Sequence, residues 1–195
     1  MPLTALITAF EPFGGETVNP SALLLGMLPE ALGPFSVRKC LLPVAYDRAD
    51  AALRAAWDPS VGLILCLGQA AGLEGLAFER VGINLDDCPS PDNDGVVRLD
   101  APIDPWAPAA IFSDLPVRAM AEAARAAGVP ARVSYSAGAY LCNHVLFRAL
   151  QLAAQKPGCR AGFIHMSCVP GQSRTPCMPA EELLKGVLAA LEVLK

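Results

Sequence analysis

The chain has 195 residues, a formal net charge of −4 and a hydrophobic content of 53%. This length predicts one domain, residues 1–195, with one substantial core. The composition excludes a disordered chain, and the scattered basic residues exclude a positive stripe that could bind a phosphate backbone, so nucleic acid is not an expected partner.

The apolar runs and the cysteines of the chain bear on membrane insertion and on disulfide or zinc binding. The N-terminus has a short apolar run with no basic stretch before it, and the run Val61–Leu67 is far shorter than the roughly 20 residues of a spanning helix. We therefore expect a cytoplasmic protein without a membrane anchor. The seven cysteines are an odd number in a compartment that keeps thiols reduced, and C-x-x-C spacing is absent. Neither a disulfide framework nor structural zinc is expected.

The first third of the chain alternates strand and helix patterns. Leu3–Ala9 is a short apolar run that ends at the turn sequence EPFGG, and Asn19 followed by Pro20 is a typical helix start. Continuous apolar residues indicate a strand covered on both faces at Val61–Leu67. The other elements expected here are a strand at Phe35–Val44 and a helix at Arg48–Trp57.

The same alternation continues to the C-terminus. A helix is expected at Val117–Ala127, because Gly128 and Pro130 follow it, and another after Cys142, where apolar residues recur at helical spacing. Strands are expected at Ala131–Tyr135 and Ala161–Met166, and a last helix at Ala180–Leu194. This order predicts an α/β fold, a three-layer α/β/α sandwich with a mostly parallel twisted sheet and its functional groups at the strand ends.

One segment, Asp86–Pro108, is rich in Pro, Asp and Gly and has little periodicity. A loop of this length in a compact domain either serves a function, such as covering a site, or is a surface excursion. The pattern does not decide between the two.

The chain has only two histidines, His144 and His165, for any cysteine–histidine pair. Cys142 and His144 are two positions apart, so on a helix they point to different sides. His165 ends an apolar strand, where a catalytic base would lie. Cys142 lies near a helix N-terminus, which favours a thiolate. A packing role for each remains the alternative, and spacing does not identify an acid among 19 carboxylates.

Four segments in order carry a resemblance. They are Phe10–Gly15 with Asn19–Ser21, Glu79–Asn84, Ser136–His144 and Gly162–His165. Together they resemble the signature segments of the pyroglutamyl peptidase I family of cysteine peptidases, over essentially the whole chain. The resemblance implies a triad of Cys142, His165 and Glu79, an α/β/α sandwich that forms a homo-oligomer (tetramer or dimer), and neither cofactor nor metal.

In that resemblance the substrate is a peptide with an N-terminal pyroglutamyl residue. Cys142 would attack the carbonyl that follows the ring, His165 would move the proton, and Glu79 would orient the imidazole. Because the ring is a neutral lactam, its site should have apolar walls. The expected substrate-binding residues are Phe10, Phe13, Gln69, Tyr140 and Leu141; ordinary core packing is the alternative for the two phenylalanines.

Three positions depart from the family pattern. Pro89 replaces an arginine that has been connected with the oxyanion, Ser90 replaces an aliphatic residue, and Met166-Ser167-Cys168 stands where relatives tend to have a proline. A missing oxyanion donor costs about 10²- to 10³-fold in rate. Two further interpretations therefore stay open: the same triad acting on another lactam, amide or N-acyl compound, and a protein that binds pyroglutamyl peptides without cleaving them.

Overall fold

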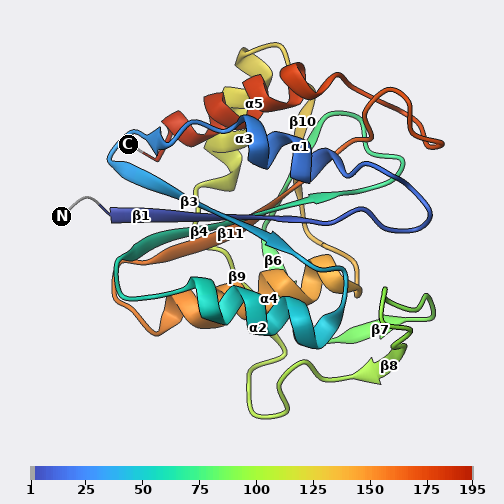
Figure 1. The fold of residues 1–195 in the computed structure, drawn as a ribbon. Coiled ribbons are helices and arrows are strands. Elements are labelled where there is room, and N and C mark those ends of the chain that lie inside the picture. Colours follow the sequence, from blue (N-terminus) through green and yellow to red (C-terminus); the bar gives the residue numbers. More distant parts are fainter. Residues whose placement is uncertain (1–2, 195) are drawn as a thin grey trace.

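The computed structural model describes residues 3–194, and a twisted seven-stranded sheet forms its centre (Figure 1). The strand order is β10-β5-β11-β4-β1-β3-β2. The strands are β1 (Leu3–Phe10), β2 (Ala31–Leu32), β3 (Phe35–Leu42), β4 (Val61–Gln69), β5 (Leu76–Glu79), β10 (Ala131–Ser134) and β11 (Arg160–Met166). Pairing is parallel except between β5 and β11 and between β2 and β3, so the mostly parallel sheet is confirmed.

The central strands are apolar on both faces because helices cover both. Every residue of β4 is buried; Leu63 and Leu65 pack on one side of the sheet, and Ile64 and Cys66 pack on the other. This alternation is the period of two of a strand, with both sides removed from water.

Helices form the two outer layers (Figure 1). One layer contains α1 (Pro20–Met27), α3 (Val117–Ala126) and α5 (Ala180–Glu192), and the other contains α2 (Tyr46–Ala56) and α4 (Leu141–Ala154). The helix start expected at Asn19 is present: its side-chain Oδ1 accepts a hydrogen bond from the Ser21 amide at 3.0 Å, and Pro20 is the first helical residue. The α/β/α sandwich expected from the sequence is therefore the observed architecture.

The segment Asp86–Pro108 is not structureless. It contains β7 (Asp86–Cys88) and β8 (Arg98–Ala101), which pair antiparallel, while β6 (Val81–Ile83) pairs with β9 (Ala110–Phe112). We call residues 86–101 the β7–β8 hairpin. Its ladder is too short and too polar to show a strand period. Buried Asp86 fixes the hairpin to α4. Its carboxylate accepts a hydrogen bond from Arg98 at 2.9 Å and contacts His144 at 2.9 Å.

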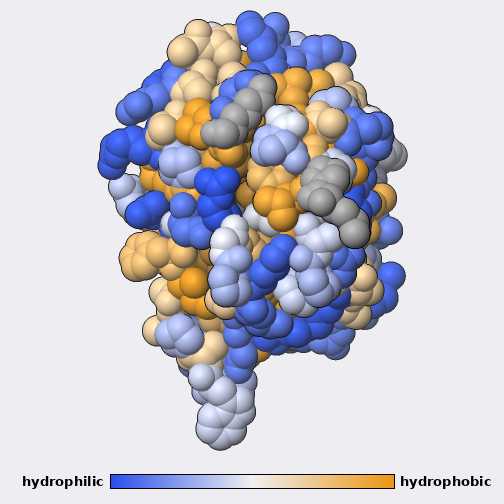
Figure 2. All heavy atoms as spheres, turned by 90° about the vertical axis from the view of Figure 1, so that its left-hand side faces the viewer, coloured by the Kyte–Doolittle hydropathy of each residue, from blue (hydrophilic) through white to orange (hydrophobic). Residues whose placement is uncertain are grey.

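Figure 2 shows the face at the N-terminal ends of the parallel strands, where hydrophilic and hydrophobic side chains are intermixed. The site described below lies at the other end of these strands. No helix within residues 3–194 is long and apolar enough to cross a membrane.

Candidate active site

Cys142 lies in the first turn of α4, after the N-cap residue Tyr140. The first helical hydrogen bond runs from the His144 amide to the Tyr140 carbonyl, at 3.0 Å. The amides of Leu141, Cys142 and Asn143 therefore have no partner within the helix, as at any helix N-terminus. This end of a helix favours a negative charge, so a thiolate at Cys142 is in a favourable position.

His165 is brought beside a buried carboxylate by the register of the sheet. It lies opposite Ala77 on the antiparallel strand β5, and Glu79 is two residues further along that strand, on the same face. Such diagonal neighbours are within reach of long side chains. The His165 Nδ1 is 2.8 Å from the Glu79 Oε1, and Glu79 is only 1% exposed. Glu79 therefore occupies Nδ1, which leaves Nε2 for a reacting group.

The electrostatics of this pair favour an imidazolium. Burial works to lower the pKa of His165, but the Cys142 thiolate and the Glu79 carboxylate outweigh it and raise the pKa to about 9. By contrast, burial raises the pKa of the Cys66 thiol to about 12, so that this neighbouring cysteine stays protonated. The charged form of His165 is thus favoured where its ring faces Cys142.

Gly68 leaves the room that this arrangement needs. It pairs with His165 across β4 and β11. A Cβ at this position would lie 2.6 Å from the Phe163 ring and 3.1 Å from the Cys142 Sγ. The first distance is a steric clash, so a side chain here would displace the Phe163 ring beside the sulfur and the imidazole.

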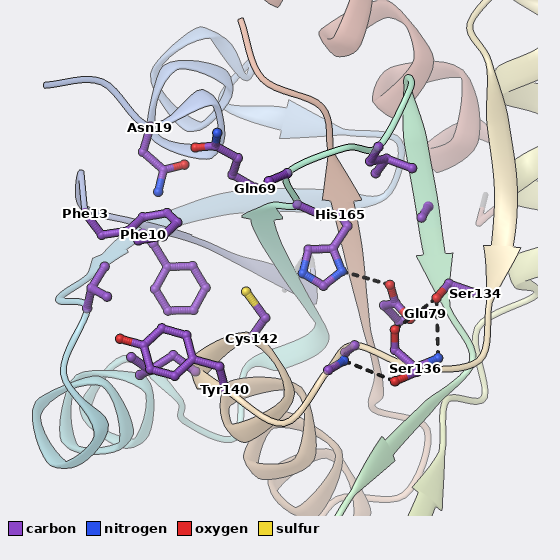
Figure 3. A pocket seen from close by; sticks show the side chains of 18 of the residues that line it. Phe10, Phe13, Asn19, Gln69, Glu79, Ser134, Ser136, Tyr140, Cys142 and His165 are labelled. Atoms are coloured by element: carbon purple, nitrogen blue, oxygen red, sulfur yellow. Dashed lines mark hydrogen bonds and ion pairs between the residues drawn. The ribbon is translucent and has the colours of Figure 1, made fainter. Parts of the chain in front are cut away.

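The sulfur of Cys142 and the ring of His165 both face a cavity of about 380 Å³ (Figure 3). The size is that of a small-ligand site. All the residues proposed from the sequence line it: Phe10, Phe13, Gln69, Glu79, Tyr140, Leu141, Cys142 and His165. Phe10 is 4% exposed and packs in the core, and it also forms part of the cavity wall.

Polar contacts hold two walls of the cavity in place. The Gln69 Nε2 donates to the Cys168 Sγ at 3.1 Å, and the Gln172 Nε2 donates to the Gln69 Oε1 at 3.2 Å. The Tyr140 hydroxyl donates to the Pro91 carbonyl at 3.2 Å. The walls are therefore tied to the segment after β11 and to the β7–β8 hairpin.

The β7–β8 hairpin supports the cavity from outside. Its Asn93 amide donates to the Val44 carbonyl at 2.8 Å, and its Asp87 amide donates to the Ala139 carbonyl at 2.8 Å. None of its residues lines the cavity. Arg98 does not replace the missing arginine at Pro89, because its guanidinium binds Asp86 and Asp47 at 2.9 and 2.6 Å.

His144 is a structural residue, as its spacing from Cys142 predicts. It is 2% exposed, contacts Asp86, and packs against the edge of Tyr46 with 5.4 Å between ring centroids. The analysis of the sequence missed its neighbour Asn143, whose amide donates to the carbonyls of Ile83 and Leu85 at 2.9 and 3.0 Å. Asn143 thus joins β6 to the helix that carries Cys142.

Arg132, Ser134 and Arg174 also line the cavity and were not predicted, because nothing in their local sequence pattern sets them apart. Within residues 3–194 there is no group of three or more His, Cys, Asp or Glu side chains that could hold a metal ion. The groups at the cavity are a nucleophile in the first turn of a helix and a base bound to a carboxylate. This set is suited to acyl transfer.

Comparison with known proteins agrees with this chemistry. The family model described as pyroglutamyl peptidase matches residues 3–195. The pyrrolidone-carboxylate peptidase of Escherichia fergusonii is 41% identical over 96% of this chain and 91% of its own length. The pyrrolidone-carboxylate peptidase of Levilactobacillus brevis is 40% identical over 97% of this chain and 96% of its own length. Pyroglutamyl peptidase I from Bacillus amyloliquefaciens superposes with a TM-score of 0.93, at 35% identity, covering 98% of this chain and 94% of that one. Pyrrolidone carboxyl peptidase from Thermococcus litoralis superposes with a TM-score of 0.92, at 35% identity, covering 98% of this chain and 92% of that one.

Proposed function

The chain belongs to the pyroglutamyl peptidase family, and we propose that it hydrolyses the bond after an N-terminal pyroglutamyl residue of peptides, with Cys142 as nucleophile, His165 as acid–base and Glu79 as the orienting carboxylate. One observation carries the proposal: Cys142, and a His165 whose Nδ1 is bound to a buried Glu79, meet at one cavity.

The first step forms a thioester. The Cys142 thiolate attacks the carbonyl carbon that joins the pyroglutamyl ring to the next residue, and the oxygen of that carbonyl becomes negative. The unpaired amides at the start of α4 supply donors for this oxyanion, in place of the arginine that Pro89 replaces. The His165 imidazolium then gives its proton to the departing amine.

The second step releases free pyroglutamate. Neutral His165 takes a proton from water, the hydroxide formed attacks the thioester carbon, and the thiolate leaves. Throughout both steps, Glu79 keeps the proton on Nδ1 and stabilises the imidazolium by its charge.

The cavity walls match the ring. Phe10, Phe13, Tyr140 and Leu141 supply apolar contact, and Gln69 supplies a polar contact near the ring amide. Among the described residues, Glu79 is the only carboxylate in the lining, and it is bound to His165, so none of them offers a free acidic group to an α-ammonium. A neutral lactam is therefore favoured over an ordinary charged N-terminus.

The test is Cys142→Ala. We expect wild-type protein to release coumarin from pyroglutamyl-7-amido-4-methylcoumarin, the variant to release none, and circular dichroism of the two to coincide. A matched control is Cys40→Ala, which changes a half-buried thiol away from the cavity. Turnover by pure Cys142→Ala protein would refute the assignment, and a wild type that is inactive on this substrate would refute the function.

We also propose a cytoplasmic homo-oligomer, either a dimer or a tetramer. Large apolar side chains on the surface, including Phe112 at 66% and Leu99 at 60% exposure, support an interface. Light scattering coupled to size exclusion decides it; a monomer mass at micromolar concentration would contradict the proposal.

A further inference from the structure

Two arginines line the cavity without a role in the reaction proposed above. Arg132 and Arg174 are the only arginines or lysines in its described lining, and both are exposed. The only carboxylate in the lining, that of Glu79, is bound to His165. Among residues 3–194 neither guanidinium has a carboxylate within ion-pair distance. The rim therefore offers two cations to a ligand.

The sheet register directs Arg132 toward the reacting groups. Arg132 pairs with Ala77, and Ala77 pairs with His165. Directly opposed residues project from the same face of a sheet, so Arg132 and His165 share one face and lie two strand spacings, about 10 Å, apart.

Arg174 approaches the cavity from the segment after β11. Its Nη2 would lie 3.7 Å from a Cβ at Gly14, so the guanidinium lies over the EPFGG turn. Glu16 is the acidic group nearby: hydrogen bonds from Ser173 and the charge of Arg174 lower its pKa. Glu16 accepts hydrogen bonds from Ser173 and, among the described residues, forms no ion pair with Arg174.

The pyroglutamyl ring has no charge, so it gives these cations nothing to bind. In the proposed reaction the ring lies against the apolar walls, so the residue that leaves as the amine would extend past His165 toward the rim. We propose that Arg132 and Arg174 select pyroglutamyl peptides that carry a carboxylate on the residue after the ring, either as an acidic side chain or as the C-terminus of a dipeptide. This inference rests on the proposed function and adds its substrate class.

The experiment compares pairs of substrates that differ in one charge. The first pair is pyroglutamyl-Glu-Ala amide and pyroglutamyl-Gln-Ala amide; the second is pyroglutamyl-Ala with a free carboxyl group and its amide. We expect kcat/KM at low salt to favour the charged member of at least one pair by about two- to five-fold, the effect of an exposed ion pair, and to lose this preference at high salt. The pair that shows the preference identifies the source of the carboxylate.

Variants separate charge selection from a structural role. Arg132→Gln and Arg174→Gln should lower the charged-to-neutral ratio toward one, while Arg118→Gln, an exposed arginine outside this cavity, should keep it. A ratio of one in both pairs for the wild type, or equal losses on charged and neutral peptides in the variants, would overturn the inference. Hydrolysis of the coumarin substrate distinguishes these results from a failure of the proposed function itself, since it requires no carboxylate.

A separate observation concerns two other cysteines. Cys168 and Cys177 are partners in an isolated parallel β-bridge, and the Met178 amide donates to the Cys168 carbonyl at 2.8 Å. Bridged strands lie about 4.8 Å apart, which is within the Cα separation of disulfides. Cys168 is fully buried and Cys177 is exposed, so Cys177 is the cysteine that an oxidant in solution can reach.

We infer that Cys168 and Cys177 form a disulfide when a low-molecular-weight disulfide such as oxidised glutathione is present. The Cys177 thiolate attacks one sulfur of the oxidant and releases one reduced glutathione; the Cys168 thiolate then displaces the second. Two protein thiols lose two electrons and two protons, and one oxidised glutathione becomes two reduced molecules. The bond would close residues 169–176, which include Arg174 in the cavity lining and Gln172, whose side chain bonds Gln69.

Peptide mapping after alkylation in denaturant tests the second inference. Wild-type protein treated with oxidised glutathione should give a peptide pair linked through Cys168 and Cys177, and reduction should restore both alkylation sites. Cys40→Ser should still give the linked pair, and Cys177→Ser should leave Cys168 alkylated. Alkylation of both cysteines after oxidation, or glutathione retained on Cys177, would overturn it.

Discussion

Replacing Glu79 with glutamine removes the negative charge beside His165 and leaves an amide of nearly the same shape. The amide oxygen can still accept from Nδ1, so the position of the ring is kept while its electrostatic support is lost. Because Glu79 is buried and its Oε1 is 2.8 Å from the His165 Nδ1, solvent screens this interaction little.

The size of the effect follows from that contact. A hydrogen bond to a charged group contributes about 1.5–3 kcal/mol, and 1.36 kcal/mol corresponds to one pKa unit. The carboxylate favours the imidazolium, so its loss lowers the pKa of His165 from about 9 by about one to two units. The alkaline limb of kcat/KM, where the leaving amine loses its proton donor, should move down by the same amount. At the optimum we expect a loss of about 10²- to 10⁴-fold.

The assay is kcat/KM for the coumarin substrate between pH 5 and 11, for wild type, Glu79→Gln and Glu122→Gln. Glu122 is an exposed carboxylate on α3, outside this cavity, and its variant should follow the wild-type curve. The alkaline limb of the profile reports the coupled cysteine–histidine pair, so the test compares its position in the variant with that in the wild type. An alkaline limb that stays in place in Glu79→Gln would refute the role of this carboxylate.

Three further substitutions test the walls and supports of the cavity. Phe13→Ala removes an apolar wall and should raise KM for a pyroglutamyl substrate by about tenfold, the effect of losing part of a ring contact; an unchanged KM would remove Phe13 from the pocket. Gly68→Ala places a methyl group against Phe163 and Cys142, so it should lower the free energy of unfolding by about 1–3 kcal/mol and lower kcat. Urea unfolding and turnover measure the two effects, and wild-type values in both would contradict the steric argument. Asn19→Ala should cost about 1 kcal/mol through loss of the α1 cap, and an unchanged unfolding midpoint would contradict that role.

The order of elements and the positions of Cys142 and His165 could be predicted because both depend on local patterns. A continuous apolar run ending in His165 places this residue near the C-terminal end of its strand. Helical spacing after Cys142 places the thiol at a helix start. Each prediction depends only on residues close in sequence, where the hydrophobic period and the turn residues indicate the element and its ends.

Glu79 could not be found in the same way, because the direction of β5 decides its place. The rule for parallel strands puts functional groups at the C-terminal ends, but β5 runs antiparallel to β11. Its last residue therefore lies level with Phe163 and diagonal to His165, inside the sheet. No residue within four-residue β5 indicates which way the strand runs, so only the resemblance pointed to this carboxylate.

The two histidines show why a histidine–carboxylate pair does not by itself identify an active site. His144 is 2.9 Å from Asp86, and His165 is 2.8 Å from Glu79; both pairs are buried. The pairs differ in what surrounds the second ring nitrogen: the His144 Nε2 is enclosed and has no hydrogen-bond partner among the described residues, whereas His165 faces the cavity beside Cys142. Because residues two apart on a helix project from different sides, the first turn of α4 directs Cys142 to the cavity and His144 to the β7–β8 hairpin. The orientation of that turn thus gives His144 a structural role and leaves His165 beside Cys142, where we propose that it acts as the base.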